Sequence, residues 1–148
     1  MTRSRQRGVT LLELMTVVMI IGVLASIAIP SYRSYLMRAQ RSDATAALLR
    51  LAAAQEKFYL QNNRYATNAE IAAGPPAGLG IPRTEHNFYT LSLAAGLDNT
   101  LQFLATATPV AAGPQAKDAG CATFTIDQQG TRGAKDSSNA VKTESCWR

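Results

Sequence analysis

A single carboxylate lies within the most apolar part of the chain. Residues 9–29 form a nearly unbroken apolar run in which Glu13 is the only charged residue. A carboxylate inside hydrocarbon costs at least about 2.5 kcal/mol on insertion scales, so it needs a cationic partner there. An ammonium group close to Glu13 would make its burial tolerable. The alternative is a carboxylate that lies near the lipid headgroups and is solvated by water.

The two cysteines are the other residues with chemistry of their own. Cys121 and Cys146 lie near the C-terminus, and beside an export-type N-terminus they indicate an oxidising compartment and a disulfide. If they pair, they close a loop of about 25 residues, which a chain-entropy argument credits with roughly 3.5 kcal/mol. The sequence has no CxxC motif, Cys/His cluster or zinc spacing. We therefore expect no metal site and no cofactor.

The sequence offers little material for catalysis. It has one histidine, His86, and no nucleophile motif, acidic cluster or Gly-rich phosphate loop. His86 beside Glu85 is interpreted as a solvated loop pair rather than a catalytic dyad. Asp136–Asn139 is interpreted as a turn rather than a calcium loop. We expect that the protein is not an enzyme.

Basic residues are frequent in the C-terminal region, which raises the question of nucleic-acid binding. Three of them, Arg132, Lys135 and Lys142, are the candidates for DNA contact. Acidic residues are interleaved with them, so an ordinary solvated surface of mixed charge is favoured. The net charge of +5 adds little, because three of the fifteen basic residues lie within the first eight positions.

The elements that position these residues begin with a long apolar helix. About 21 residues at helical rise span roughly 31 Å, the thickness of the hydrocarbon core of a membrane. The run is longer than the apolar part of a secretory signal, and no small-x-small cleavage site follows Ile29. An uncleaved signal anchor is one interpretation. The arginines on the two sides of the run balance, so charge leaves the topology open, but the cysteines favour a C-terminal domain outside the cytoplasm.

The helical pattern continues beyond Pro30 to about Leu60. Apolar residues recur there at one-, three- and four-residue steps and form an amphipathic stripe: Ala44, Ala47, Leu48, Leu51, Ala52, Gln55, Phe58 and Tyr59. We expect one helix over residues 9–60. Gly22 and Pro30 are its weak points, because proline removes a backbone hydrogen bond and glycine is a weak helix former.

Short alternating segments after the helix predict strands. A Gly/Pro-rich surface loop over residues 74–82 comes first. The expected strands are Tyr89–Leu93, Leu101–Thr106, Thr123–Asp127 and Val141–Trp147, with turns at residues 96–99 and 129–130. The predicted fold class is α+β, in which the C-terminal half of the long helix packs on a small antiparallel sheet.

Residues 7–14, Arg7-Gly8-Val9-Thr10-Leu11-Leu12-Glu13-Leu14, resemble the processing motif of type IV prepilins. In that family a dedicated membrane peptidase cuts after the glycine, the new N-terminal residue is N-methylated, and a glutamate stands at the fifth mature position. Gly8, Val9 and Glu13 match in order and spacing, and Pro30 falls where the family commonly has proline. Val9 departs from the usual phenylalanine.

The resemblance implies roles for several residues. In assembled pilins the glutamate, here Glu13, pairs with the terminal amine of a neighbouring subunit, here that of Val9. The segment Gly22–Pro30 would be a hinge that partly melts in the filament, although a kink within a membrane helix fits equally well. Residues 59–66 resemble the end of the pilin helix, and the ending Cys146-Trp147 resembles minor pilins of the PilE type.

The resemblance also implies three parts of the chain: a leader peptide (1–8), a transmembrane and filament-core helix (9–34), and a periplasmic or extracellular head (35–148) that includes the disulfide loop 121–146. The implied partners are other pilin subunits, the prepilin peptidase that also N-methylates, the inner-membrane pilus assembly machinery, and lipid before assembly. The protein would lie in the inner membrane before assembly and in a cell-surface pilus afterwards.

The implied function is that of a structural subunit, a minor pilin, of a type IV pilus that supports adhesion, twitching motility or DNA uptake. Two alternatives stay open. One is a DNA-binding, pilin-like receptor for natural transformation. The other is a type II secretion pseudopilin, which the cysteine pair disfavours.

Overall fold

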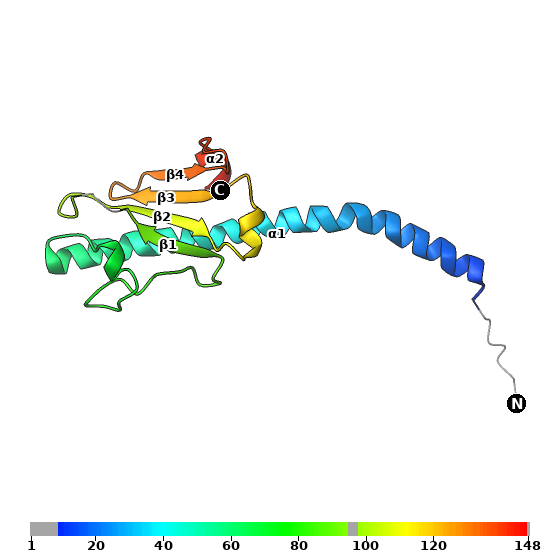
Figure 1. Ribbon diagram of the computed structural model, residues 1–148, viewed down its shortest axis with the longest axis horizontal. Coiled ribbons are helices and arrows are strands. Elements are labelled where there is room, and N and C mark those ends of the chain that lie inside the picture. Colours follow the sequence, from blue (N-terminus) through cyan, green and yellow to red (C-terminus); the bar gives the residue numbers. More distant parts are fainter. Residues whose placement is uncertain (1–8, 95–97, 148) are drawn as a thin grey trace, which may run out of the picture. The chain divides into compact units, whose positions relative to one another are not determined.

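The structure, a computed structural model, describes residues 9–94 and 98–147. It consists of a long helix, a four-stranded antiparallel sheet and short helical segments (Figure 1). The helices and strands are α1 (Leu11–Asn62), β1 (Tyr89–Leu93), β2 (Leu104–Pro109), β3 (Thr123–Asp127), β4 (Arg132–Lys135) and α2 (Thr143–Cys146). Two 3₁₀ turns, η1 (Asn68–Glu70) and η2 (Pro114–Lys117), lie between them. The predicted α+β fold is confirmed.

The chain divides into two compact units, and α1 runs through both. The first unit ends at Leu36 and the second begins at Met37. In the described part of the first unit, α1 is exposed almost throughout. The unit therefore has no core of its own among its described residues.

The ends of α1 differ from the predicted bounds by two residues each. The helix begins at Leu11 rather than at Val9, because Thr10 caps it: its Oγ1 accepts from the backbone N–H of Glu13 at 3.3 Å. It ends at Asn62 rather than Leu60. Asn63 then takes a left-handed φ of 53°, the conformation that commonly terminates a helix.

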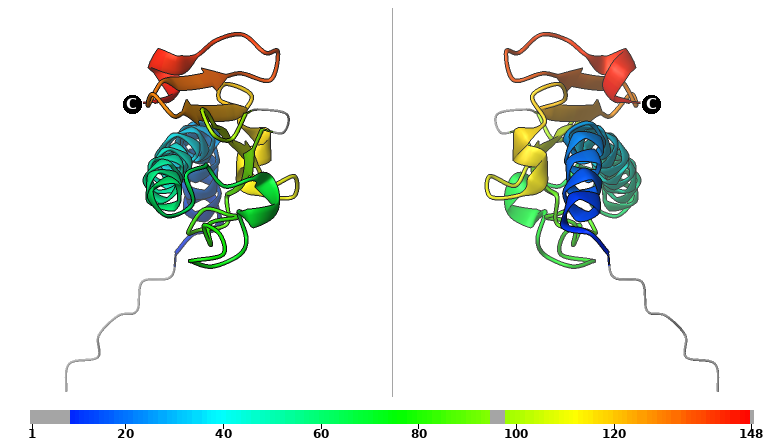
Figure 2. Two further views of the ribbon diagram at one scale, coloured as in Figure 1. Left: turned by 90° about the vertical axis from the view of Figure 1, so that its left-hand side faces the viewer. Right: turned by 90° about the vertical axis from the view of Figure 1, so that its right-hand side faces the viewer.

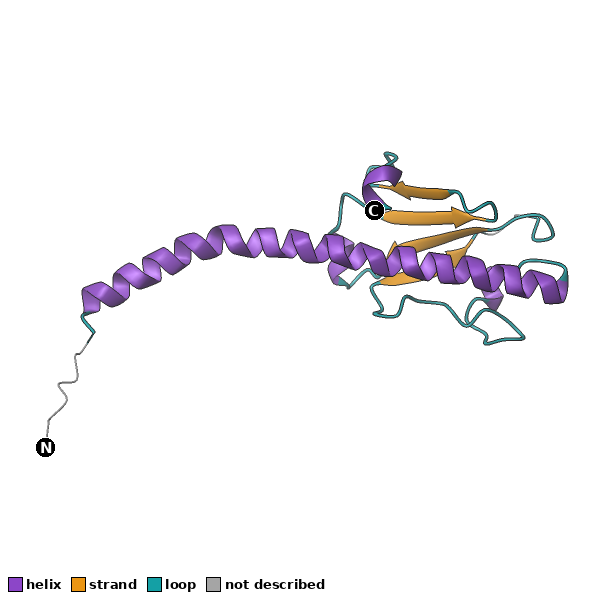
Figure 3. Cartoon of the chain, turned by 180° about the vertical axis from the view of Figure 1, so that it is seen from behind, coloured by secondary structure: helices purple, strands orange, loops and turns teal. Residues whose placement is uncertain are grey.

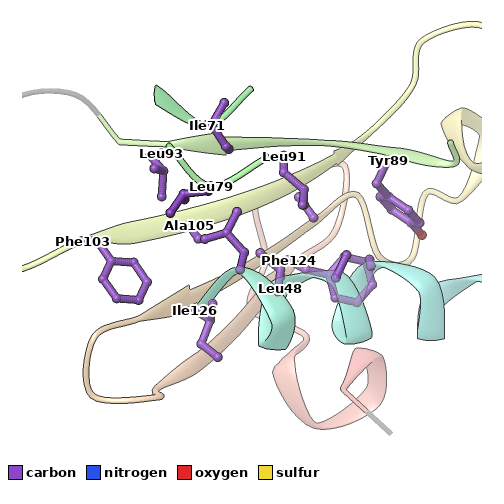
Figure 4. Close-up of a cluster of buried hydrophobic side chains, with 14 of the residues drawn as sticks. Leu48, Ile71, Leu79, Tyr89, Leu91, Leu93, Phe103, Ala105, Phe124 and Ile126 are labelled. Atoms are coloured by element: carbon purple, nitrogen blue, oxygen red, sulfur yellow. The ribbon is translucent and has the colours of Figure 1, made fainter. Parts of the chain in front are cut away.

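The second unit holds the hydrophobic core. There the C-terminal half of α1 lies across one face of the sheet (Figure 3). The helix buries most of the stripe predicted from the sequence, namely Ala44, Ala47, Leu48, Leu51, Gln55 and Phe58. Ala52 and Tyr59, also predicted, are half-buried. The sheet contributes alternating residues of its strands, among them Leu91, Ala105, Phe124 and Ile126 (Figure 4). The core is therefore formed by side chains at helical spacing from α1 and by alternating side chains from the strands.

The sheet has the order β1-β2-β3-β4, and each neighbouring pair is antiparallel. The strands predicted at Tyr89–Leu93 and Thr123–Asp127 are confirmed with those bounds. The strand predicted at Leu101–Thr106 begins later, at Leu104. Leu101 is exposed, and its backbone N–H closes a turn on the carbonyl of Asp98 at 3.0 Å.

The predicted last strand, Val141–Trp147, is wrong. Residues Thr143–Cys146 form the short helix α2, and Val141 makes only an isolated bridge to Lys135. The fourth strand is β4, which lies at the same edge of the head as α2 (Figure 2). Only Ala134 of β4 is buried, so the segment lacks the apolar alternation that would have predicted a strand.

The turn predicted at residues 129–130 is confirmed. Gly130 has a φ of +75°, and its backbone N–H donates to the carbonyl of Asp127 at 3.0 Å. The turn predicted at residues 96–99 lies partly outside the described residues. Residues 74–82 form the expected loop, although not all of it lies at the surface, since Leu79 within it is buried.

Candidate functional site

The first candidate surface is the apolar segment at the start of α1. Its large side chains from Val9 to Ile29 are all exposed, by 49% at the least. The helix is long and apolar enough to cross a membrane, and no part of its most apolar stretch of 18 residues is buried. Monomeric soluble proteins rarely expose an apolar surface of this extent, so lipid or other protein chains must cover it.

Glu13 lies in the first turn of this segment. Its backbone N–H is capped by Thr10, and its carbonyl accepts from the hydroxyl of Thr16 at 2.8 Å. Its carboxylate makes no hydrogen bond or ion pair with any residue that the structure describes. Gly8 lies outside the described residues, so cleavage between Gly8 and Val9, methylation of Val9 and its pairing with Glu13 stay predictions.

The two predicted weak points, Gly22 and Pro30, lie within an uninterrupted stretch of α1. Pro30 has no N–H to donate to the carbonyl of Ser26, one turn earlier. Nearby hydroxyls bond to the helix backbone: Ser26 Oγ donates to the Val23 carbonyl at 2.7 Å, and Ser34 Oγ to the Pro30 carbonyl at 3.0 Å. A hinge at this segment stays a prediction.

A buried polar network joins η2 to α1 in the second unit. Arg41 donates to both carboxylate oxygens of Asp118, at 2.7 and 2.8 Å. Gln115 donates to Gln40 Oε1 at 2.7 Å and accepts from the hydroxyl of Tyr89 at 3.1 Å. The pKa of Tyr89 is raised, mainly because its phenol is buried and to a smaller extent because of the negative charge of Asp118. The bond to Asp118 raises the pKa of Arg41.

A second polar cluster holds the chain where α1 ends. Arg64 donates to both carboxylate oxygens of Glu70, at 2.9 and 2.7 Å. The backbone N–H and hydroxyl of Thr67 also donate to Glu70 Oε2, at 2.8 and 2.9 Å. These donors, led by Arg64, lower the pKa of Glu70 to about 2. The buried side chain of Gln55 bonds to both backbone groups of Ala66, at 3.1 and 2.8 Å.

The C-terminal loop is closed by the expected disulfide between Cys121 and Cys146. Both cysteines are buried. Next to them, Trp147 Nε1 donates to the carbonyl of Gly133 at 2.7 Å. The Arg132 guanidinium lies over the indole ring of Trp147, 5.2 Å from the ring centroid.

The three residues predicted as candidates for DNA contact lie close together in the chain's last elements. Arg132 and Lys135 bound β4, and Lys142 directly precedes α2; all three are exposed. Two of the interleaved acidic residues serve local turns. Asp127 accepts from the backbone N–H groups of Gln129 and Thr131 at 2.9 and 2.8 Å. Asp136 likewise accepts from residues of the predicted turn at 136–139, which is confirmed.

His86 is solvated as predicted, but its partner is not Glu85. His86 Nδ1 lies 3.0 Å from Asp43 Oδ1, while Glu85 pairs with Arg50 at 3.4 Å. No local sequence signal identifies Asp43 as this partner, because the two residues lie 43 positions apart and a carboxylate on a helix face does not show what it contacts. Within residues 9–94 and 98–147, no group of three or more metal-binding side chains occurs.

Comparisons with known proteins agree with the resemblance of the processing motif. Residues 30–125, about two thirds of the chain, match the family described as "Type IV minor pilin ComP, DNA uptake sequence receptor". Residues 3–29 match the prokaryotic N-terminal methylation motif.

Pilins and fimbrial proteins from other bacteria are similar to this chain in sequence, and one solved pilin structure is similar in fold. The type IV major pilin protein PilA of Myxococcus xanthus is 42% identical over 93 residues, which cover 62% of this chain and 40% of PilA. The fimbrial protein EcpC of Eikenella corrodens is 35% identical over 120 residues, covering 79% of this chain and 74% of EcpC. The structure of the non-core minor pilin PilV of Neisseria meningitidis has the same fold, with a TM-score of 0.54 at 18% identity over 72% of this chain and 94% of PilV. The exposed apolar helix, the sheet on its second half and these matches together show that the chain belongs to the type IV pilin family.

Proposed function

We propose that this chain is a structural, non-catalytic subunit of a type IV pilus, and that it is a minor one. The observation that carries the proposal is the exposed apolar segment from Val9 to Ile29 on a type IV pilin. Lipid covers this segment before assembly, and the same segments of other subunits cover it afterwards. A contact between unlike surfaces of successive subunits does not close on itself, so it generates a filament.

The proposed division of the chain follows from this assembly. Residues 1–8 are a leader that the prepilin peptidase removes, residues 9–34 form the transmembrane and filament-core helix, and residues 35–148 form the head. The disulfide supports a head on the periplasmic side of the inner membrane, and later on the cell surface, because disulfides persist in oxidising compartments. The machinery that extracts the subunit from the membrane is the expected further partner.

Glu13 is proposed to set the register between subunits. Its carboxylate has no partner in the described part of a single chain, and the methylated amine of Val9 in a neighbour would supply one. A carboxylate left alone in an apolar core is costly, so only the register that pairs it is favourable. The same cost drives Glu13 out of lipid and into the filament.

The first test is the intact mass of protein extracted from membranes of a piliated host. We expect loss of the first eight residues, one added methyl group and the absence of two thiol hydrogens. The second test compares Glu13→Gln with the matched control Glu56→Gln, which removes an exposed carboxylate further along α1. Glu13→Gln should be processed normally but should fall about tenfold or more in the sheared pilus fraction. Equal recovery of the two variants would overturn the proposed role of Glu13, and native protein that still starts at Met1 would overturn the processing.

A second candidate function is DNA binding. The matched family is described as a DNA uptake sequence receptor, and Arg132, Lys135 and Lys142 are exposed. However, the match ends at residue 125, before all three. The candidate contacts therefore do not lie in the part of the chain that resembles that family.

This candidate is tested by binding of duplex DNA to the full chain in detergent. A DNA receptor should bind at about 50 mM salt and weaken steeply toward about 200 mM. The triple variant Arg132→Ala, Lys135→Ala, Lys142→Ala should lose most of the affinity, whereas Lys57→Ala with Arg83→Ala should retain it. Absence of binding at low salt excludes the candidate.

A further inference from the structure

The carboxylate of Asp43 is almost inaccessible to water. Its side chain is 9% exposed, although it lies on α1 beside the surface. Oδ1 lies 3.0 Å from Nδ1 of His86. Oδ2 is buried and has no hydrogen-bond partner among the described residues. A buried carboxylate with one unsatisfied oxygen is costly, so the arrangement depends on the positive charge that His86 can supply.

His86 belongs to the turn of residues 84–89, which is stabilised by hydrogen bonds among its own residues. The backbone N–H of Thr84 donates to the carbonyl of Tyr89 at 3.0 Å, and the N–H of Asn87 donates to the carbonyl of Thr84 at 3.1 Å. The N–H of Tyr89 donates in turn to Thr84 Oγ1 at 3.1 Å. None of these bonds involves α1. Its two ends, Thr84 and Tyr89, are buried in the core, so only the exposed residues 85–87 can move against the helix, and the bond of Asn87 then opens more often.

Two polar contacts tie the 84–89 turn to α1. One is the contact between His86 and Asp43. The other joins Arg50 to Glu85 at 3.4 Å, with side chains 52% and 69% exposed. An ion pair this open to water contributes little. The side chain of His86 is also open to water, at 66%, but that of Asp43 is 9% exposed, so water screens the contact with Asp43 less.

We propose that His86 and Asp43 form a pH-sensitive clasp, which docks the 84–89 turn on α1 while His86 is protonated and releases it when His86 is neutral. Without its charge, His86 offers Asp43 at most a neutral hydrogen bond. Water can reach Oδ2 of Asp43 only when the turn moves away, so hydration of that oxygen favours release. A groove of about 540 Å³ between α1 and the turn, lined in part by Ala46 and Phe88, opens further on release. The head then presents different surfaces at low and high pH.

The charged and titratable groups around the clasp determine whether the pKa of His86 is raised or lowered, and so at which pH the turn is docked. The bond to Asp43 and then its charge raise the pKa of His86, and Glu85 adds a smaller effect of the same sign. Arg50, on α1, is engaged by Glu85. From β1, Tyr89 faces Asp43, but burial raises the pKa of its phenol, which stays neutral through the relevant range.

Beyond Tyr89, Arg41 and Asp118 neutralise each other. The clasp is therefore governed by His86 alone near neutral pH. A group whose pKa is raised in one state stabilises that state below its unperturbed pKa and loses this effect as the pH rises through the raised value. Docking is fully favoured below about pH 6.5, the ordinary pKa of histidine, and weakens above it.

The test uses the full chain in detergent micelles. His86 is the only histidine in the chain, so its imidazole nitrogens give one set of NMR signals to follow against pH. We expect its pKa to lie above about 6.5 and to fall back toward that value in Asp43→Asn. Hydrogen exchange of the backbone N–H of Asn87, in the exposed part of the turn, is corrected for the intrinsic effect of pH and measured at about pH 5.5 and about pH 8.5. Protection should fall about tenfold for each unit by which docking raises the pKa of His86.

Two variants at exposed residues test the clasp even if Asp43→Asn does not fold. His86→Gln should show low protection of the turn at both pH values. Glu85→Gln, the matched control, removes the other tie and should keep the pH step. A His86 pKa at or below about 6.5, equal protection at both pH values in the wild type, or a pH step that persists in His86→Gln would each overturn the clasp. None of these outcomes depends on pilus assembly.

Discussion

At the scale of single residues, burial separates two ion pairs of the same chemistry. Arg41 and Asp118 pair with side chains that are 19% and 4% exposed, whereas Arg50 and Glu85 pair in the open. Water screens the open pair, but it cannot solvate Asp118 if its partner is lost. The two arginines lie nine positions apart on one helix, and the sequence gives no sign of the difference.

Arg41→Ala should destabilise the head by about 3 kcal/mol, because it leaves the buried carboxylate of Asp118 without its charged partner, with only the N–H of Gly120 as a donor. Arg50→Ala is the matched control and should change stability by about 0.5 kcal/mol or less. Urea unfolding of both variants measures the difference. Equal effects of the two substitutions would show that burial of Asp118 does not matter.

Glu70 should make the head sensitive to acid. Its pKa is lowered to about 2, chiefly by Arg64. A lowered pKa stabilises the folded state above the unfolded value, near 4.5, and this stabilisation disappears as the pH falls toward 2. The wild type should therefore lose stability over that window, and Glu70→Gln should lose less there while being less stable at neutral pH. Thermal unfolding between about pH 2 and pH 7 tests this, and identical pH profiles would contradict it.

At the scale of elements, the pattern of apolar residues predicted most of what forms the core. The stripe on α1 and the alternation in β1 and β3 are strong because the second half of α1 and each of the two strands bury one face. β4 was missed because it is an edge strand with one buried residue, Ala134. Gly133 fits there because a Cβ at that position would collide with the hydroxyl of Thr125. The apolar residues near Val141 favoured a strand that does not form.

Loss of the disulfide should destabilise the C-terminal elements. The bond spans 25 residues, and the entropy of the open loop predicts about 3.5 kcal/mol or somewhat less. The double variant Cys121→Ser, Cys146→Ser should unfold at correspondingly lower urea. Fluorescence of Trp147, the only tryptophan, reports on the neighbouring region. A reducing agent should reproduce the effect in the wild type and leave the double variant unchanged, and an unchanged wild-type midpoint would contradict the prediction.

At the scale of the whole molecule, the two units differ in what they need from their surroundings. The core of the second unit lies between Ala44 and Cys146, so it requires nothing from the first. The first unit exposes its apolar side chains and depends on lipid or on other chains.

A chain that begins at Met37 should therefore be soluble in water and monomeric, with its disulfide formed. The full chain should require detergent or assemble. Light scattering and circular dichroism of the two proteins make the comparison. A truncated chain that is unfolded, or that still self-associates, would contradict the independence of the head.

The sequence by itself determined the elements whose signals are local. The motif around Gly8, Val9 and Glu13, the exposed apolar helix and the stripe that meets the sheet are all readable there, because hydrophobic periodicity and charge act over a few turns. Only the tertiary structure decided which polar groups meet. Asp43 with His86, and Arg41 with Asp118, lie 43 and 77 positions apart. Such pairs depend on how α1 lies against its loops, and that arrangement exists only once the core has formed.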